Sequence, residues 1–171
     1  MNGVRPALPP DDAAIGELLV LAFERTYARK MPEVVMGELR KAELRDVKGK
    51  RAVARVWVYE KSGEIAGTVA VWPPEAKGSE AWIEGALDLR HLAVEERHRG
   101  GDISRALLDA AETHAREVKA TAVCLHVRRG AVGVRRLYES RGYLRRPEGD
   151  LFLPEVFLEA FALPLPPRTG S

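Results

Sequence analysis

The segment from Ala86 to Val127 constrains the fold more than any other part of the chain. A nearly continuous apolar run, ALDLRHLAV, leads through a glycine-containing loop into a helical pattern, and a second apolar run, TAVCLHV, follows. Near-continuous apolar runs are typical of strands that are covered on both faces of a sheet. A strand–helix–strand unit in one sheet forms a right-handed parallel crossover. The segment therefore predicts two parallel central strands joined by a helix.

The remaining patterns extend this unit into one mixed sheet. Helical spacing of apolar residues predicts leading helices over 13–30 and 31–47. Alternating residues on either side of 61–64 predict a hairpin. A short helix over 131–140 and two strands within 143–165 complete the order. We therefore expect an α/β fold, with a central mixed sheet and helices on its faces.

The bulk composition is that of an ordinary globular domain. The chain has 171 residues, of which 46% are hydrophobic and 30% charged, so we expect one domain over 1–165 and a flexible tail over 166–171. No long apolar run or secretory signal is recognised, which predicts a soluble, cytoplasmic protein without a membrane span. The single cysteine, Cys124, lies in an apolar run and is expected to be a buried structural thiol rather than a nucleophile.

Positive charge is concentrated in one half of the chain. The segment from Arg90 to Arg146 holds 13 Arg or Lys residues against 7 Asp or Glu residues, although the whole chain carries a net charge of only +2. Solvated helix faces account for most of these side chains, but an anionic ligand is the functional alternative. Basic and aromatic residues are not interleaved, so no nucleic-acid partner is expected. No metal site is predicted either.

The loop in the sequence RHRGGDISRALL, which begins at Arg97, has the composition of an anion-binding turn. Gly100 and Gly101 stand where the chain enters the next helix. The first backbone N–H groups of a helix have no intrahelical partner, and the helix dipole adds positive charge there. The loop is therefore a candidate pyrophosphate site. The alternative is a plain turn in which Asp102 or Ser104 caps the helix, since the loop matches neither a P-loop nor a dinucleotide-binding fingerprint.

Two motifs in register resemble those of the GNAT superfamily, the acetyl-CoA-dependent N-acetyltransferases. The stretch HLAVEERHRGGDISRALLDAA is similar to the first family signature, which reads roughly L-A-V, four variable residues, R-G-x-G-x-G/A and x-x-L-L. The second family block begins with L-x-V and ends in a short helix with the pattern L-Y-x-x-x-G-F/Y. Leu125 and Val127 match the first part, and Leu137, Tyr138, Gly142 and Tyr143 match the second.

The resemblance implies the GNAT-like acyl-CoA N-acyltransferase fold and acetyl-CoA as co-substrate. In that fold two parallel central strands, here 87–94 and 123–127, splay apart around the cofactor. The acceptor would be a primary amine on a small molecule or a peptide, and family members often form homodimers. The residues that the resemblance assigns to cofactor binding are Leu92, Ala93, Val94, Arg99, Gly100, Gly101, Asp102, Ile103, Ser104 and Arg105.

The resemblance also implies two catalytic residues. Tyr138 falls on the family's frequent general acid, and a phenol with a pKa of about 10 can protonate a departing thiolate. Its alternative is an aromatic side chain that packs its helix onto the sheet. Asp88 falls where some members place a catalytic carboxylate, and the alternative is a polar residue on a half-exposed strand. His91 and His126 have suitable intrinsic pKa values, although structural histidines are more common.

Two positions depart from the family pattern. Asp102 replaces the second signature glycine and brings a negative charge to a candidate phosphate site, unless its carboxylate turns outward or pairs with Arg99 or Arg105. Ala131 replaces a frequent cofactor-contacting asparagine. The leading hypothesis is an N-acetyltransferase, and the alternative is a degenerate, non-catalytic binding or regulatory module. Trp57, Trp72 and Trp82 either line an acceptor pocket or fill the core.

Overall fold

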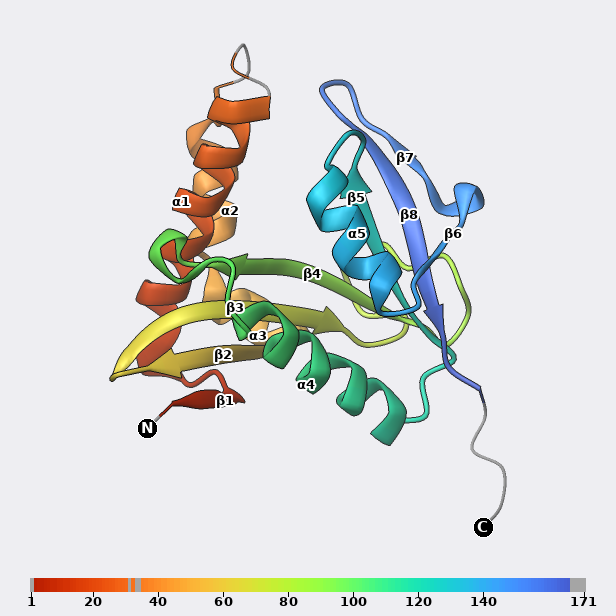
Figure 1. The fold of residues 1–171 in the computed structure, drawn as a ribbon, viewed down its shortest axis with the longest axis horizontal. Coiled ribbons are helices and arrows are strands. Elements are labelled where there is room, and N and C mark those ends of the chain that lie inside the picture. The colour runs from red at the N-terminus through yellow and green to blue at the C-terminus, as the bar shows by residue number, and fades with distance from the viewer. Residues whose placement is uncertain (1, 31, 33–34, 167–171) are drawn as a thin grey trace. The chain divides into compact units, whose positions relative to one another are not determined.

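The computed structural model describes residues 2–30, 32 and 35–166. Within these residues an eight-stranded mixed sheet has the strand order β1-β2-β3-β4-β5-β8-β6, with β7 paired to β8 (Figure 1). The strands are β1 (Gly3–Pro6), β2 (Arg55–Lys61), β3 (Glu64–Trp72), β4 (Leu87–Val94), β5 (Ala122–Arg128), β6 (Leu144–Arg145), β7 (Leu151–Phe152) and β8 (Phe157–Pro164). The α-helices are α1 (Asp12–Lys30), α2 (Glu38–Arg45), α3 (Val47–Val53), α4 (Ile103–Glu117) and α5 (Val132–Ser140).

The chain divides into two compact units. The N-terminal unit comprises the described residues of Met1–Val71 and His91–Ala111, and the C-terminal unit comprises those of Trp72–Arg90 and Glu112–Ser171. Strand β4 and helix α4 each contribute one part to each unit. The single domain expected over 1–165 stays a prediction.

In the N-terminal unit, β1, β2 and β3 form an antiparallel meander. The predicted hairpin is confirmed, and its turn residues Ser62 and Gly63 both have positive φ. The buried face of α1 includes Ile15 and Leu19, as its helical spacing predicts. Gly67 on β3 lies so close to α4 that a Cβ there would come within 2.9 Å of the Ile103 side chain. This close approach holds α4 against the sheet.

In the C-terminal unit, β5 is the central strand. It pairs parallel with the start of β4, at Leu87↔Val123 and Asp88↔Cys124, and antiparallel with β8 along its whole length. Because consecutive residues from Ala122 to Leu125 are buried and point to opposite faces, both faces of the strand are covered, which explains its near-continuous apolar sequence. Cys124 is fully buried, which confirms the expected structural thiol, and burial raises its pKa to about 11.

Two parts of the sequence prediction are wrong in detail. The helix expected over 31–47 is instead α2, which begins after Gly37, followed by a separate helix α3 that the periodicity did not predict. Asp46 explains the break, because it leaves helical geometry and its side chain accepts the backbone N–H of Gly49 to cap α3. In the tail, the first expected strand is two short strands, β6 and β7. The flexible tail expected over 166–171 lies outside the described residues except for Pro166.

Candidate functional site

The loop between β4 and α4 lies in the N-terminal unit and leads directly into a helix N-terminus. A short 3-10 turn, Glu96–His98, follows the strand, and α4 begins at Ile103. Gly100 has φ +80°, and a left-handed backbone of this kind strongly favours glycine. Of the two glycines, Gly100 is therefore the one that supplies the left-handed turn. The backbone thus turns where the helix presents its free N–H groups.

The carboxylate of Asp102 turns towards water and towards its own helix. The side chain is 94% exposed, and Oδ1 lies 3.6 Å from a guanidinium nitrogen of Arg105, one turn further along α4. The backbone carbonyl of Asp102 accepts the N–H of Ala106, which is the first hydrogen bond of the helix. Of the alternatives considered for this residue, the structure therefore shows the pairing with Arg105.

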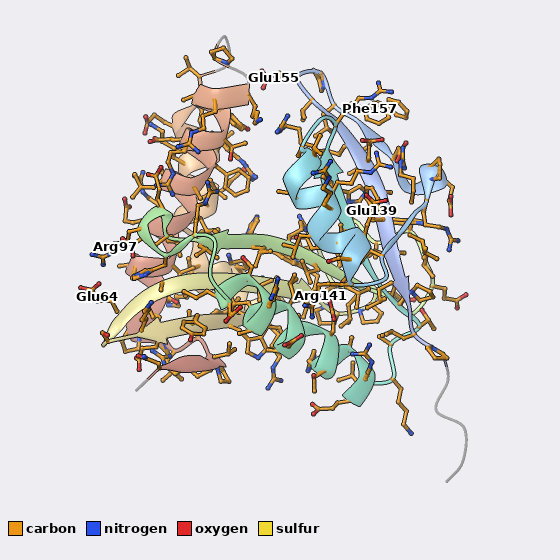
Figure 2. The ribbon with its side chains drawn as sticks, viewed as in Figure 1. Glu64, Arg97, Glu139, Arg141, Glu155 and Phe157 are labelled. Carbon is orange, nitrogen blue, oxygen red and sulfur yellow. The ribbon has the colours of Figure 1, made fainter. Side chains whose placement is uncertain are left out.

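The arginine side chains of the loop are solvent-exposed, and Arg97 pairs with acidic residues of the same unit. Arg97 forms ion pairs with Glu64, at 2.5 Å, and with Glu95, at 2.9 Å (Figure 2). Glu96 is held by two arginines of α1, Arg25 and Arg29. These pairs fix the outer side of the loop.

Strand β4 changes its partners along its length. Its parallel ladder with β5 ends after Asp88, although β4 continues to Val94 and β5 to Arg128. A parallel ladder that covers only the first residues of the two strands is the pairing pattern that the sequence resemblance predicts. The backbone groups from Leu92 to Val94 therefore take no part in this ladder, and backbone groups of this kind suit an extended amide-bearing ligand.

His91 marks a distortion in the middle of β4. Its φ is +61°, which is uncommon for a residue other than glycine. In the N-terminal unit the ammonium group of Lys50, on α3, donates to Nδ1 of His91 over 3.1 Å, and the ring of Phe23 contacts the imidazole edge to face. Because an ammonium group has no lone pair, Nδ1 is the acceptor. No sequence pattern predicts the contact between Lys50 and His91.

Asp88, in the C-terminal unit, is completely buried. Its Oδ2 accepts the backbone N–H of Glu80 at 2.8 Å and lies 2.8 Å from Nε of Arg90. Burial raises the pKa of Asp88, and the nearby positive charge of Arg90 only partly opposes this rise. The carboxyl group is therefore more basic than an aspartate in water, as a proton acceptor must be.

Arg90 ties Asp88 to the preceding loop. Its guanidinium lies 4.1 Å from the ring centre of Trp72, forms an ion pair with Glu80, and donates to the carbonyl of Gly78. Stacking on an aromatic face and pairing with a carboxylate both suit a guanidinium. Trp72 therefore supports the loop that covers Asp88.

His126 and Trp82 lie next to each other in the same unit. The Nε2 atom of His126 lies 2.8 Å from the carbonyl oxygen of Gly149, and the rings of His126 and Trp82 meet edge to face at 5.3 Å. A Cβ at Gly149 would come within 2.3 Å of the Trp82 ring. Gly149 is therefore required where the indole packs.

Tyr138 is buried in the C-terminal unit, close to Tyr143 and Glu112. Its ring meets that of Tyr143 edge to face at 5.4 Å. Burial and the negative charge of Glu112 both raise the pKa of Tyr138 above its ordinary value, so the phenol stays protonated. Glu112 accepts two hydrogen bonds of 2.9 Å from Arg141 and one of 3.1 Å from the hydroxyl of Tyr143. This network holds the end of α5 against α4.

The predicted residues fall into two sets. All ten predicted cofactor-binding residues lie in the N-terminal unit, whereas Tyr138, Asp88 and His126 lie in the C-terminal unit. Ala131 stands at the N-cap of α5 without a side-chain hydrogen bond. Among the described residues no cluster of metal-ligating side chains occurs, and no helix is both long and apolar enough to cross a membrane.

Sequence comparison adds known relatives to this geometry. The sequence profile of the Acetyltransferase (GNAT) family matches residues 13–143. N-acetyltransferase 8 of Rattus norvegicus is 31% identical over 146 residues, which cover 83% of this chain and 62% of that relative. The chain therefore spans less than two thirds of the length of this curated relative.

Solved structures share the fold. The structure titled histone acetyltransferase HPA2 and related acetyltransferase, from Corynebacterium glutamicum, matches with a TM-score of 0.73 at 20% identity, over 99% of both chains. PaiA N-acetyltransferase from Thermoplasma acidophilum, in complex with coenzyme A, matches with a TM-score of 0.68 at 15% identity, over 94% of this chain and 98% of that chain. At such identities the likeness concerns the fold. The family profile carries the conclusion that this chain belongs to the acetyltransferase (GNAT) family.

Proposed function

We propose that the chain is an N-acetyltransferase that uses acetyl-CoA and a primary amine. The observation that carries the proposal is the loop from Arg99 to Ser104, where a left-handed Gly100 leads into the N-terminus of α4 immediately after a strand whose parallel ladder has ended. Acetyl-CoA supplies an activated thioester, which an amine attacks directly. Coenzyme A in the related PaiA structure and the family match support this choice of co-substrate.

In this proposal the N-terminal unit binds the cofactor. The backbone of Leu92, Ala93 and Val94 hydrogen-bonds the pantetheine amides, and the N–H groups from Arg99 to Ser104 bind the pyrophosphate. Arg105 adds positive charge at the same helix end. The orientation of Asp102 supports this role for the loop, because a fully exposed carboxylate paired with Arg105 repels a phosphate weakly. In water two unit charges 4 Å apart interact by only about 1 kcal/mol.

The C-terminal unit supplies the acid and the base. Tyr138 is the proposed general acid: its raised pKa keeps the phenol protonated, so that its O–H can donate to the thiolate as the C–S bond breaks. Asp88 is the proposed general base, since burial makes its carboxyl group more basic than usual. The homodimer and the cytoplasmic location stay predictions from the sequence.

A turnover assay tests the proposal. Purified protein is incubated with acetyl-CoA and, in turn, an alanyl peptide, a lysine ester and a polyamine, and acetylated product is measured by mass spectrometry. We expect acetylation of at least one amine, and Tyr138→Phe is expected to lower kcat by about 10²-fold or more, the usual contribution of acid catalysis. Glu139→Gln, on the exposed face of the same helix (Figure 2), is the matched control and should keep the wild-type rate.

Two results would contradict the proposal. If acetyl-CoA binds but no amine in a broad panel is acetylated, the chain is the non-catalytic binding module. If Tyr138→Phe acetylates at the same rate as Glu139→Gln, then Tyr138 is not the acid and serves only to pack α5 against the sheet.

A further inference from the structure

Besides Nε of Arg90, which lies 2.8 Å from Oδ2 of Asp88, three buried polar atoms of the C-terminal unit have no hydrogen-bond partner among the described residues. They are Oδ1 of Asp88, Nδ1 of His126 and Nε1 of Trp82. Buried polar atoms are hydrogen-bonded in most proteins, and each exception asks for an explanation. Here three exceptions come from different parts of the chain, one from β4, one from β5 and one from the loop that precedes β4.

The three side chains share one face of the sheet. Asp88 is the ladder partner of Cys124 on the parallel strand β5, so both side chains point to the same side. His126 follows Cys124 by two residues and therefore lies on that side as well. Trp82 packs against the buried cluster that contains Cys124, and its ring contacts the imidazole of His126.

Electrostatics indicate the same proximity. His126 is one of the charged groups whose attraction lowers the pKa of Asp88 against the larger effect of burial. The contacts of Asp88 with Arg90 and with the backbone of Glu80 are both made by Oδ2. Oδ1 is therefore the oxygen of Asp88 that has no hydrogen-bond partner among the described residues.

Each of the three atoms has a donor or acceptor role that follows from its chemistry. A carbonyl oxygen accepts only, so Nε2 of His126 donates to the carbonyl of Gly149, and in the neutral imidazole Nδ1 then presents a lone pair. Oδ1 of Asp88 is also an acceptor. The indole N–H of Trp82 is a donor only. The cluster therefore combines two acceptors, one of them on a carboxyl group, with one donor.

We propose that Asp88 and His126 bind the primary ammonium group of the acceptor, while Trp82 donates to an oxygen on the carbon next to it. This proposal rests on the proposed function and narrows its acceptor to primary amines with an adjacent carbonyl, such as an α-amino acyl group. An ammonium group is a compact cation with several N–H donors, which matches two convergent acceptors and one negative charge. An anionic ligand would meet the carboxylate of Asp88.

Ligand titrations followed by NMR of the His126 ring test the proposal on the full chain. Three small probes of similar size separate the contributions: glycinamide carries the ammonium and the carbonyl, propylamine the ammonium alone, and propionamide the carbonyl alone. We expect glycinamide and propylamine to shift the ring signals of His126 saturably, and propionamide to leave them in place. Glycinamide should bind several-fold more tightly than propylamine.

Variants then assign each contact. Asp88→Asn and His126→Gln are each expected to weaken glycinamide binding about tenfold. In His126→Gln, which has no imidazole, binding is measured from the NMR signals of neighbouring residues. Trp82→Phe should remove the advantage of glycinamide over propylamine. Glu148→Gln is the control. Glu148 is next to Gly149 in sequence, and its exposed carboxylate pairs with Arg146. The variant should bind glycinamide and propylamine as the wild type does.

The outcomes separate this proposal from the proposed function. If acetyl-CoA is turned over but neither amine shifts the His126 signals, the ammonium site is wrong and the function stands. If both amines bind as expected but acetyl-CoA does not bind, the site stands and the function fails. If propionamide and glycinamide shift the His126 signals equally, the ammonium site is also overturned, because the cluster would then bind any polar group and not an ammonium group in particular. If Asp88→Asn and His126→Gln both unfold, unchanged glycinamide affinity in Trp82→Phe still contradicts the role of the indole.

Discussion

The two polar regions of this chain differ in how they meet water. In the loop before α4 the charged side chains are open to solvent: Arg97 is 61% exposed, Arg105 71% and Asp102 94%. In the C-terminal unit the charged groups are desolvated, with Asp88 at 0% and Glu112 at 8% exposure. In the proposed function the loop keeps its charges in water, whereas the C-terminal unit removes water from the groups that set proton affinity.

This difference predicts where mutations matter. Exposed ion pairs contribute about 0–1 kcal/mol because water and salt screen them. A buried charge that loses its partner costs several times more, because nothing replaces the lost interaction. Substitutions in the C-terminal unit are therefore expected to change stability, and substitutions in the loop are expected to change ligand binding only.

The largest effect is expected at Glu112. Glu112→Gln leaves the guanidinium of Arg141 without its carboxylate in a largely buried position, which should lower the free energy of unfolding by about 3 kcal/mol or more. Urea unfolding measures this change. Glu139→Gln removes an exposed ion pair between Glu139 and Arg135, both on α5. It should lower the free energy of unfolding by less than about 0.5 kcal/mol. Equal losses in the two variants would erase the distinction between buried and exposed charges.

A slightly smaller effect is expected at Gly149. Gly149→Ala places a methyl group within 2.3 Å of the Trp82 ring, and the displacement of the indole should cost about 1–3 kcal/mol. Gly133→Ala, in α5, is the matched control, since a Cβ there meets no atom within 4 Å. It should stabilise the chain slightly, because alanine favours a helix more than glycine does. Thermal unfolding compares the two variants, and a neutral Gly149→Ala would show that the indole moves freely.

Asp88 is expected to make stability depend on pH. Folding raises its pKa above the ordinary value of about 3.9, so the folded chain binds more protons than the unfolded chain as the pH rises past that value. Stability from this group is therefore present at low pH and lost as the pH rises through the folded pKa. Asp88→Asn lacks this loss, so its stability relative to the wild type should rise from about pH 4 to about pH 7. A relative stability that falls over this range would show that Arg90 outweighs burial.

The smallest effect is expected at Asp102. Asp102→Gly removes a carboxylate that is exposed and paired with Arg105, so acetyl-CoA affinity should change by no more than about threefold. Asp102→Asn, which keeps the side-chain shape without its charge, separates charge from backbone freedom. Tenfold tighter binding in both variants would mean that the carboxylate opposes the phosphates. Tenfold weaker binding in Asp102→Gly alone would mean that the side chain organises the loop.

The sequence predicted those parts of the fold whose signal is local. The strand 87–94, the helix beginning at Ile103 and the strand 122–128 carry continuous apolar runs or helical spacing, so their types were confirmed. Helix α3 has little apolar periodicity and depends on the Asp46 cap, so it was missed. The strands β6 and β7 are two residues each and exist because β8 pairs with them, which no local pattern reveals.

The candidate site was predictable to the same extent. The positions of Gly100, Tyr138 and Asp88 followed from motif spacing, because a motif fixes a residue relative to its strand or helix. The contacts of Glu112 with Tyr143 and of His126 with Gly149 join distant segments. Such contacts depend on tertiary packing, and the sequence alone carried no sign of them.

Calorimetric titration with acetyl-CoA tests the central claim, that the loop before α4 binds the pyrophosphate of the cofactor. The account predicts one-to-one binding to the wild type. It also predicts binding about tenfold weaker in Gly100→Ala, because alanine is strained at φ +80°, and nearly wild-type binding in Gly101→Ala, where the added Cβ makes an ordinary contact of 3.7 Å. The absence of binding by the wild type at high micromolar acetyl-CoA, or equal affinity in Gly100→Ala and the wild type, would contradict it.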